Sequence, residues 1–370
     1  MNYRRMSIEI ESPEEMGYST IRYNLAESSV RDHSLGELKI DLNHVVLAYG
    51  EHKGITALRE IIVAGSPILK ADDVLVTTGA AMALFLISTT LLDKNDHIVV
   101  IRPNYATNLE TPRAIGCEMT IVDLDFNDNF SLNTEGVAQA LKPNTKLISI
   151  TNPHNPTGVL FPQETIHALI GIAEKHGCYL VVDETYRDLN FQTPLSPYAA
   201  VKSEKVISVC SLSKAFGVPG IRIGWLLCRD KALMHTLLAA KEQIILGNAV
   251  LDEEIALHLL KQKHAFLEPI HAHIRQNFQL MKAWMEKQPY LEWVEPTAGV
   301  VSFPRLKKRF RLDFPSFQHA LYHDFQTVVG YGHWFEQSER YFRIGFGYPS
   351  KADLLEGLHR FETCLEKFVF

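Results

Sequence analysis

Short apolar runs rich in β-branched residues alternate with helix-like segments between about residues 55 and 230 of this 370-residue chain. Residues 74–78 (VLVTT) and 97–101 (HIVVI) are two such runs, and EMTIVDL, KLISIT, CYLVVDE and KVISVC follow them. Strands that are apolar on both faces and separated by helices form mainly parallel sheets covered by helices. The alternation therefore predicts an α/β fold, and we expect IRIGWLLC, residues 221–228, to complete the sheet.

The pattern changes after residue 230. A long helical region with few breakers covers about residues 230–288, and short strands (LEWVE, VVSFPRL and YFRIGFG) then mix with helices. This mixture predicts a smaller α+β domain beside the large one. We expect the large domain to comprise residues 35–255, and the small domain to comprise residues 1–34 and 256–370.

Composition narrows the class of protein. Hydrophobic residues make up 46% of the chain and charged residues 22%, which is typical of a globular protein. The net charge of -6, without a dense basic stripe, disfavours a nucleic-acid surface. Five cysteines without a CxxC pair predict reduced thiols and no metal site. No signal-like run opens the chain, and no apolar stretch reaches the roughly 18 residues that cross a bilayer, so we expect a cytoplasmic protein.

Polar residues follow two of the predicted strands. The loop TNPHNPTG, which contains Asn155, comes directly after KLISIT, and Asp183 ends the strand CYLVVDE. Ligands of open α/β sheets bind at the carboxyl ends of the strands. A carboxylate at the end of an apolar strand needs a positive partner or a donor, and a protonated pyridine nitrogen is one such partner. Tyr186, three residues later, can present its hydroxyl to the same ligand.

A lysine and a phosphate-binding pattern follow the strand KVISVC. Lys214 lies in SLSKAFGVPGIRIGW among small residues and hydroxyls. Desolvation there is expected to lower its pKa and free the amine for Schiff-base chemistry. Ser211 and Arg222 flank it and suit a phosphate group.

A second phosphate-binding feature lies upstream, where TTGAAMALFL passes from a strand through Gly79 into a helix. The free N–H groups at such a helix start bind anions. The segment matches neither GxGxxG nor GxxxxGK[ST], which disfavours a nicotinamide cofactor or a nucleoside triphosphate.

Together these segments resemble the class I/II aminotransferases, which are fold-type I enzymes that depend on pyridoxal 5′-phosphate (PLP). TNPHNPTG, VVDETY and SLSKAFGVPGIRIGW occur in the family's order, and the resemblance extends from YGEHKG near residue 50 to YFRIGFG near residue 345. It implies that Lys214 forms the Schiff base with PLP and moves a proton, while Asp183 keeps the ring nitrogen protonated. It also implies cofactor contacts by Asn155, Tyr186 and Tyr105, and phosphate contacts by Gly79, Ala80, Ser211 and Arg222.

Two further roles depend on the resemblance alone. Tyr49, in AYGEHKG, matches the tyrosine that reaches the phosphate in the neighbouring subunit, which implies a homodimer with shared active sites. Arg343, in YFRIGFG, matches the arginine that holds the substrate's α-carboxylate. The implied activity is transfer of an amino group between an L-amino acid and a 2-oxo acid.

The chain departs from the family at two places. NLAESSV stands where many members have a glycine-rich segment, so Glu27 or Ser28 can face the substrate side chain; Glu27 there would suggest a basic substrate. GYGHWFEQ replaces a Pro-Gly-small turn, so His333 and Trp334 can line the pocket.

Other reactions remain open on this scaffold. A C–S β-lyase, or an enzyme that cyclises an arginine-like amino acid, would use the same lysine and aspartate. A PLP-binding transcription regulator is disfavoured, because the family match begins near residue 20 and leaves no room for a DNA-binding extension. A catalytically dead homologue is disfavoured because every expected cofactor residue is present.

Overall fold

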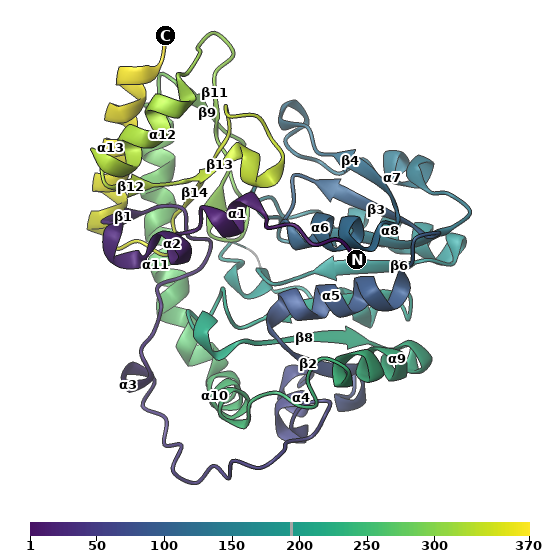
Figure 1. The fold of residues 1–370 in the computed structure, drawn as a ribbon. Helices are drawn as coiled ribbons and strands as arrows, with labels where there is room; N and C mark the ends of the chain where they lie inside the picture. The colour runs from purple at the N-terminus through teal and green to yellow at the C-terminus, as the bar shows by residue number, and fades with distance from the viewer. Residues whose placement is uncertain (193–194) are drawn as a thin grey trace.

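A seven-stranded sheet forms the centre of the computed structural model, which describes residues 1–192 and 195–370. Its strand order is β2-β8-β7-β6-β5-β3-β4 (Figure 1). The strands are β2 (Val74–Thr78), β3 (His97–Arg102), β4 (Glu118–Asp123), β5 (Thr145–Thr151), β6 (Tyr179–Asp183), β7 (Val206–Ser211) and β8 (Ile223–Cys228). All neighbouring pairs are parallel except those made by β8, which is antiparallel to β2 and β7. The predicted α/β fold with a mainly parallel sheet is confirmed.

The last strand of this sheet begins two residues later than the sequence pattern predicts. Pro219–Ile221 forms a 3-10 turn, and Arg222 has a positive φ of 36°. Extended backbone therefore resumes only at Ile223.

Helices cover both faces of the sheet because successive strand residues point to opposite sides. Leu75 and Val181 belong to one apolar cluster with α5 (Gly79–Leu91), α6 (Thr107–Ile115) and α9 (Lys231–Glu242). Their neighbours Val74 and Val182 belong to a second cluster. That cluster includes residues of α4 (Thr56–Ile62), α7 (Thr134–Ala140), α8 (Gln163–His176) and α10 (Val250–Lys261).

The predicted long helical region after residue 230 consists of three helices, α9, α10 and α11 (Lys263–Met285). Beyond it lie α12 (Phe314–His323), α13 (Lys351–Phe368) and the short strands β9 (Leu291–Glu292), β10 (Val301–Ser302), β11 (Arg305–Leu306), β12 (Thr327–Val328), β13 (Gly330–Tyr331) and β14 (Phe342–Gly345). This mixture of helices and small sheets is the α+β segment that the sequence predicts. The predicted boundary after residue 255 falls inside α10 and stays a prediction.

The N-terminal segment packs against this C-terminal part of the chain (Figure 1). It contains α1 (Ser7–Ile10), α2 (Pro13–Met16), β1 (Tyr23–Asn24) and α3 (Leu35–Leu38). β1 pairs in parallel with β12, with Tyr23 opposite Thr327. This pairing holds the residues that follow β1 beside β14, because the Gly345 amide donates to the Leu25 carbonyl at 2.7 Å.

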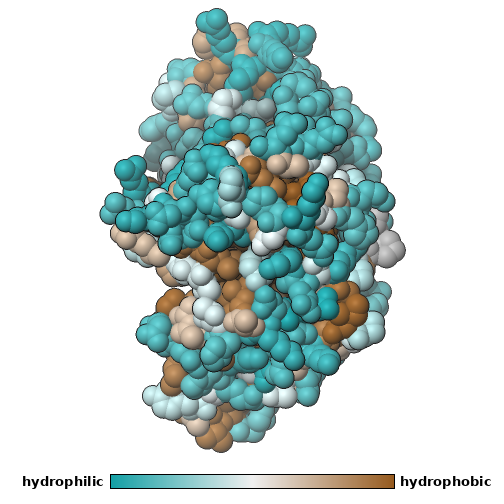
Figure 2. Space-filling model, turned by 90° about the vertical axis from the view of Figure 1, so that its right-hand side faces the viewer, coloured by the Kyte–Doolittle hydropathy of each residue, from teal (hydrophilic) through white to brown (hydrophobic). Residues whose placement is uncertain are grey.

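The apolar side chains are largely enclosed by these layers. Figure 2 shows one side of the molecule, on which hydrophilic residues dominate and apolar residues gather in separate patches. Within the described ranges, no helix combines the length and the apolar character that a membrane span needs.

One close backbone approach joins β8 to the start of α5. A Cβ atom added at Gly224 would lie 2.5 Å from the carbonyl carbon of Gly79, 2.6 Å from the Ala80 nitrogen and 2.8 Å from the Cys210 oxygen. These are backbone atoms, so a side chain at position 224 can be accommodated only by moving α5 or β7.

We expect the substitution Gly224→Ala to lower the free energy of unfolding by about 1–3 kcal/mol, because overpacking forces backbone shifts. Gly171→Ala is the matched control, because Gly171 lies in α8 with open space around its Cβ position. That control should raise stability by roughly 0.5–1 kcal/mol. Chemical denaturation measures both; equal effects of the two substitutions would contradict the close approach.

Candidate functional site

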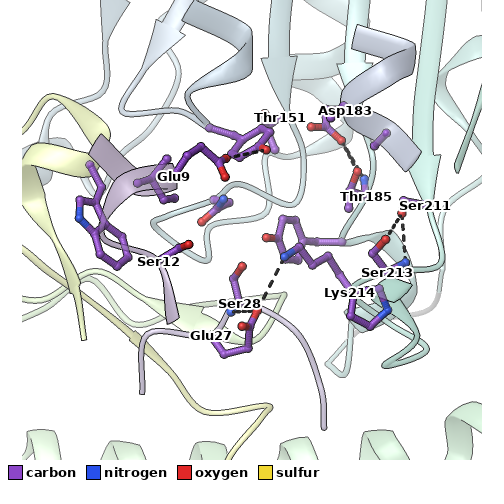
Figure 3. A pocket seen from close by; sticks show the side chains of 18 of the residues that line it. Glu9, Ser12, Glu27, Ser28, Thr151, Asp183, Thr185, Ser211, Ser213 and Lys214 are labelled. Carbon is purple, nitrogen blue, oxygen red and sulfur yellow. Dashed lines mark hydrogen bonds and ion pairs between the residues drawn. The ribbon is translucent and has the colours of Figure 1, made fainter. Parts of the chain in front are cut away.

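A cavity of about 310 Å³ lies at the carboxyl edge of the large sheet. Thr151, Asp183 and Ser211, which end β5, β6 and β7, line it from the sheet, and Figure 3 shows their side chains around it. Arg343 of β14 and the N-terminal segment line the opposite side. The cavity brings together nine residues that the sequence predicts: Ala80, Tyr105, Asn155, Asp183, Tyr186, Ser211, Lys214, Arg222 and Arg343.

One end of the cavity is rich in hydrogen-bond donors. Arg222 donates from Nη1 to the Ser213 hydroxyl at 3.2 Å, and the Ser213 amide donates to Ser211 Oγ at 3.0 Å. α5 begins beside them at Gly79, whose φ is +76°. A Cβ at Gly79 would lie 2.5 Å from Arg222 Nη2, so the glycine leaves room for the guanidinium beside the helix start. A helix N-terminus, hydroxyl groups and an arginine together suit a phosphate.

Asp183 is a buried carboxylate without a cation. Its side chain is 4% exposed, and Oδ1 accepts from the Thr185 amide at 3.0 Å and from the Thr185 hydroxyl at 2.6 Å. Burial raises the pKa of Asp183, although the Thr185 hydrogen bonds oppose this. No described cation lies within ion-pair distance of Asp183, so the carboxylate fits a positively charged ring nitrogen of a bound ligand.

Lys214 extends into the cavity from the turn after β7. Its Nζ lies 3.8 Å from Glu27 Oε1, an ion pair drawn in Figure 3. Burial lowers the pKa of Lys214, but Tyr186 and Glu27 outweigh burial, and the pKa is raised. The sequence-based expectation of a lowered pKa is therefore wrong for this arrangement, because it considered burial and not the opposing influence of Tyr186 and then Glu27.

Arg343 is held from both sides. Nη1 donates to Asn155 Oδ1 at 3.1 Å, and Nη2 donates to the Ala26 carbonyl at 2.8 Å. The side chain is 5% exposed, and among the described residues Nε has no hydrogen-bond partner. This fixed guanidinium suits a carboxylate, and the use of Asn155 Oδ1 leaves the Nδ2 group as the amide's donor for a ligand.

Some predicted residues lie outside the cavity. Tyr49 is 90% exposed in the chain segment between α3 and α4, away from the cavity lining. Trp334 and Ser28 line the cavity, but His333 does not; its Nε2 lies 2.8 Å from Glu11 Oε2, which also accepts from the Trp334 indole. The expectation that His333 lines the cavity is wrong, because its imidazole contacts Glu11 outside the cavity lining.

Sequence reasoning missed six polar residues at the cavity: Ser213, Thr185, Thr151, Ser12, Glu9 and Glu14. The first two were recognisable, because Ser213 precedes Lys214 and Thr185 follows Asp183 within the quoted motifs. The two glutamates belong to α1 and α2. Only the folding of the N-terminal segment over the sheet brings them to the site.

The sheet topology and the lysine, aspartate and arginine around one cavity define a fold-type I PLP-dependent protein. The chain belongs to the aminotransferase class I and II family, whose model matches residues 26–361.

Individual relatives agree with this family. A probable aspartate/prephenate aminotransferase of Thermus aquaticus is 29% identical over 222 residues, which are 59% of this chain and 58% of that protein, so the match spans less than two thirds of the relative. Capreomycidine synthase of Streptomyces vinaceus is 24% identical over 92% of this chain and 89% of its own length. A crystal structure of a PLP-dependent aminotransferase from Streptococcus suis is 25% identical, with a TM-score of 0.91, covering 100% of this chain and 99% of that one. The family and these structures support PLP as the cofactor.

Replacing Asp183 by asparagine separates cofactor binding from stability. Because the raised pKa makes the charged carboxylate costly in the folded cofactor-free protein, Asp183→Asn should not lower its stability at pH 7. The difference should shrink as the pH falls toward the ordinary value of 3.8, where both side chains are neutral.

PLP affinity should fall roughly 10- to 100-fold in the same variant, because the ring nitrogen loses a charged partner. Denaturation of the cofactor-free protein and a PLP titration measure the two effects. Unchanged PLP affinity would refute the role of Asp183.

Proposed function

We propose that this protein is an aminotransferase that moves an amino group between an L-amino acid and a 2-oxo acid, with PLP as cofactor. The observation that carries the proposal is the convergence of Asp183, Lys214 and Arg343 on one cavity. An acid for the ring nitrogen, an amine for the carbonyl and a cation for a carboxylate are the three groups that amino-acid chemistry on PLP requires.

In this proposal the cofactor's contacts come from the elements around the sheet edge. Asp183 keeps the ring nitrogen protonated, and Asn155 and Tyr186 donate hydrogen bonds to the ring oxygen. Tyr105 packs against the ring face. The phosphate is held by the backbone N–H groups of Gly79 and Ala80 and by the side chains of Ser211, Ser213 and Arg222. PLP, when bound, supplies an electron-withdrawing ring to the substrate's α-carbon.

Lys214 and Arg343 act on the substrate. Arg343 binds the α-carboxylate and orients the bond between the α-carbon and its hydrogen toward Lys214. Lys214 would accept that proton from the α-carbon and return it, as a general base and acid.

The proposal includes a homodimer. Val46, Leu47 and Tyr49 are 78%, 76% and 90% exposed on one segment, and exposed apolar residues in such a group mark an interaction surface. A second copy would cover this segment, and the partner copy would receive the hydroxyl of Tyr49 at its phosphate. The location we propose is the cytoplasm, supported by the five cysteines, all of which are free thiols.

A cyclising enzyme or a C–S β-lyase remains the second candidate. Capreomycidine synthase, by its name a synthase rather than a transferase, matches over most of both chains. The cavity residues named above for amino-group transfer would serve these reactions equally. Only analysis of the products can therefore distinguish the reactions.

Product analysis tests the reaction. Incubation of the holoenzyme with L-amino acids and 2-oxo acids should yield the new amino acid and the new oxo acid in equal amounts by mass spectrometry. Lys214→Ala should lower this rate by at least 100-fold, on the order of the effect of losing a general acid–base group. Pyruvate and ammonia formed without an oxo acid would indicate a lyase, and a cyclic product would indicate the cyclase.

Tyr49→Phe tests the shared site. Light scattering should show a dimer, and PLP affinity should fall roughly 10-fold, because a hydrogen bond to a charged phosphate is lost. Tyr3→Phe is the matched control, because Tyr3 is 67% exposed and lies outside the cavity lining. A monomeric holoenzyme, or equal effects of both substitutions, would exclude the shared site.

A further inference from the structure

The proposed function, on which this inference rests, gives a role to every cation that lines the cavity in the described part of the chain. Arg222 serves the phosphate, Lys214 the cofactor's carbonyl carbon and Arg343 the substrate's α-carboxylate. Asp183 serves the ring nitrogen. Three carboxylates of the lining are left over: Glu9, Glu14 and Glu27.

These three carboxylates have few partners of their own. Glu14 is exposed and its carboxylate makes no hydrogen bond or ion pair with a described residue, and Glu9 accepts one long hydrogen bond, 3.4 Å, from the Tyr105 hydroxyl. Glu27 Oε1 accepts from the Ser28 amide at 3.0 Å, and its Oε2 has no hydrogen-bond partner within the described part of the chain. In Figure 3, Glu9 and Glu27 both lie on the side of the cavity away from Asp183 and Ser211, although they are well separated from each other.

The backbone places Glu27 between the two groups that would hold the substrate. The Ala26 carbonyl accepts from Arg343 Nη2 at 2.8 Å, and the Val30 amide donates to the Lys214 carbonyl at 3.1 Å. An amino acid whose carboxylate lies on Arg343 and whose amine lies at Lys214 therefore has Glu27 beside its side chain.

Glu27 also needs a new cation when the cofactor is loaded. Its side chain is 15% exposed, and its one ion pair within the described part of the chain, at 3.8 Å, is with Lys214. Once Lys214 is bonded to the cofactor and then serves the reaction, this ammonium is no longer available to Glu27. An unpaired carboxylate at this depth is costly, and a cationic ligand removes the cost.

A neighbouring carboxylate points the same way. Behind Glu27, burial and then the charge of Glu27 raise the pKa of Asp32. Asp32 and Glu27 are thus close enough to repel each other, and a cation beside Glu27 would stabilise both.

We infer that the amino acid bound at this site carries a cationic side chain, a guanidinium or an ammonium, which Glu27 binds directly with Glu14 and Glu9 around it. This names the substrate class of the proposed reaction. It distinguishes the site from one for acidic or aromatic side chains, which would place a carboxylate or an apolar ring against Glu27.

Desamino-arginine and desamino-citrulline test the inference at equilibrium, because they are isosteric, differ in charge and lack the amine needed to react. Calorimetry on the holoenzyme should give roughly 10- to 100-fold tighter binding of desamino-arginine, as a charge-assisted hydrogen bond in a desolvated site provides. Glu27→Gln should reduce the ratio of the two affinities to about threefold or less. It should do so by weakening the binding of desamino-arginine alone, since the charge of the pair is lost. Unchanged affinity for desamino-citrulline would show that the variant is folded.

Glu15→Gln is the matched control, because Glu15 follows Glu14 on α2 but pairs with Arg5 at 3.2 Å outside the cavity lining. It should keep the full preference. A wild-type holoenzyme without preference, or a preference that survives Glu27→Gln, would overturn the inference even if amino groups are transferred. Absence of transfer with every amino acid, beside an intact preference, would refute the proposed function and leave the cation site standing.

Discussion

The parallel pairing of β5, β6 and β7 is the constraint on which the site depends. In this register the ends of the three strands lie side by side, with Thr151 opposite Asp183. Thr151 and Ser211, which are 60 positions apart in the chain, thereby reach the same edge, and the turn after β7 adds Lys214. The antiparallel β8 passes close to the start of α5 at Gly224. This contact fixes the donor-rich end of the cavity, which we propose binds phosphate, relative to the same edge.

The opposite side of the cavity depends on the N-terminal segment. β1 ties this segment to β12, the Ala26 carbonyl holds Arg343, and the Val30 amide holds the backbone of Lys214. These contacts join the two sides of the cavity through a few residues. They also place a carboxylate, Glu27, beside Lys214 in the cavity.

Charge balance explains the chemistry of the site better than any single residue does. Among residues 1–192 and 195–370, no cation pairs with the buried Asp183 and no group hydrogen-bonds to Nε of the buried Arg343, while Lys214 faces Glu27. Each of these groups is unfavourable or only partly satisfied in the protein alone. A ligand with a positive ring nitrogen, a carbonyl and a carboxylate satisfies them together, which is why the fold and the cofactor chemistry support each other.

The sequence by itself determined the α/β fold, the strand ends and many of the residues that line the cavity, because parallel strands have a distinctive apolar pattern and their loops carry contiguous motifs. TNPHNPTG and SLSKAFGVPGIRIGW each place several functional side chains within a few residues. The tertiary structure alone decided which distant residues meet these motifs. Glu9 and Glu14 lie in four-residue helices without any motif, and His333 turns to Glu11, more than 300 positions away. Such contacts depend on how two parts of the chain pack, and neither periodicity nor local motif records that packing.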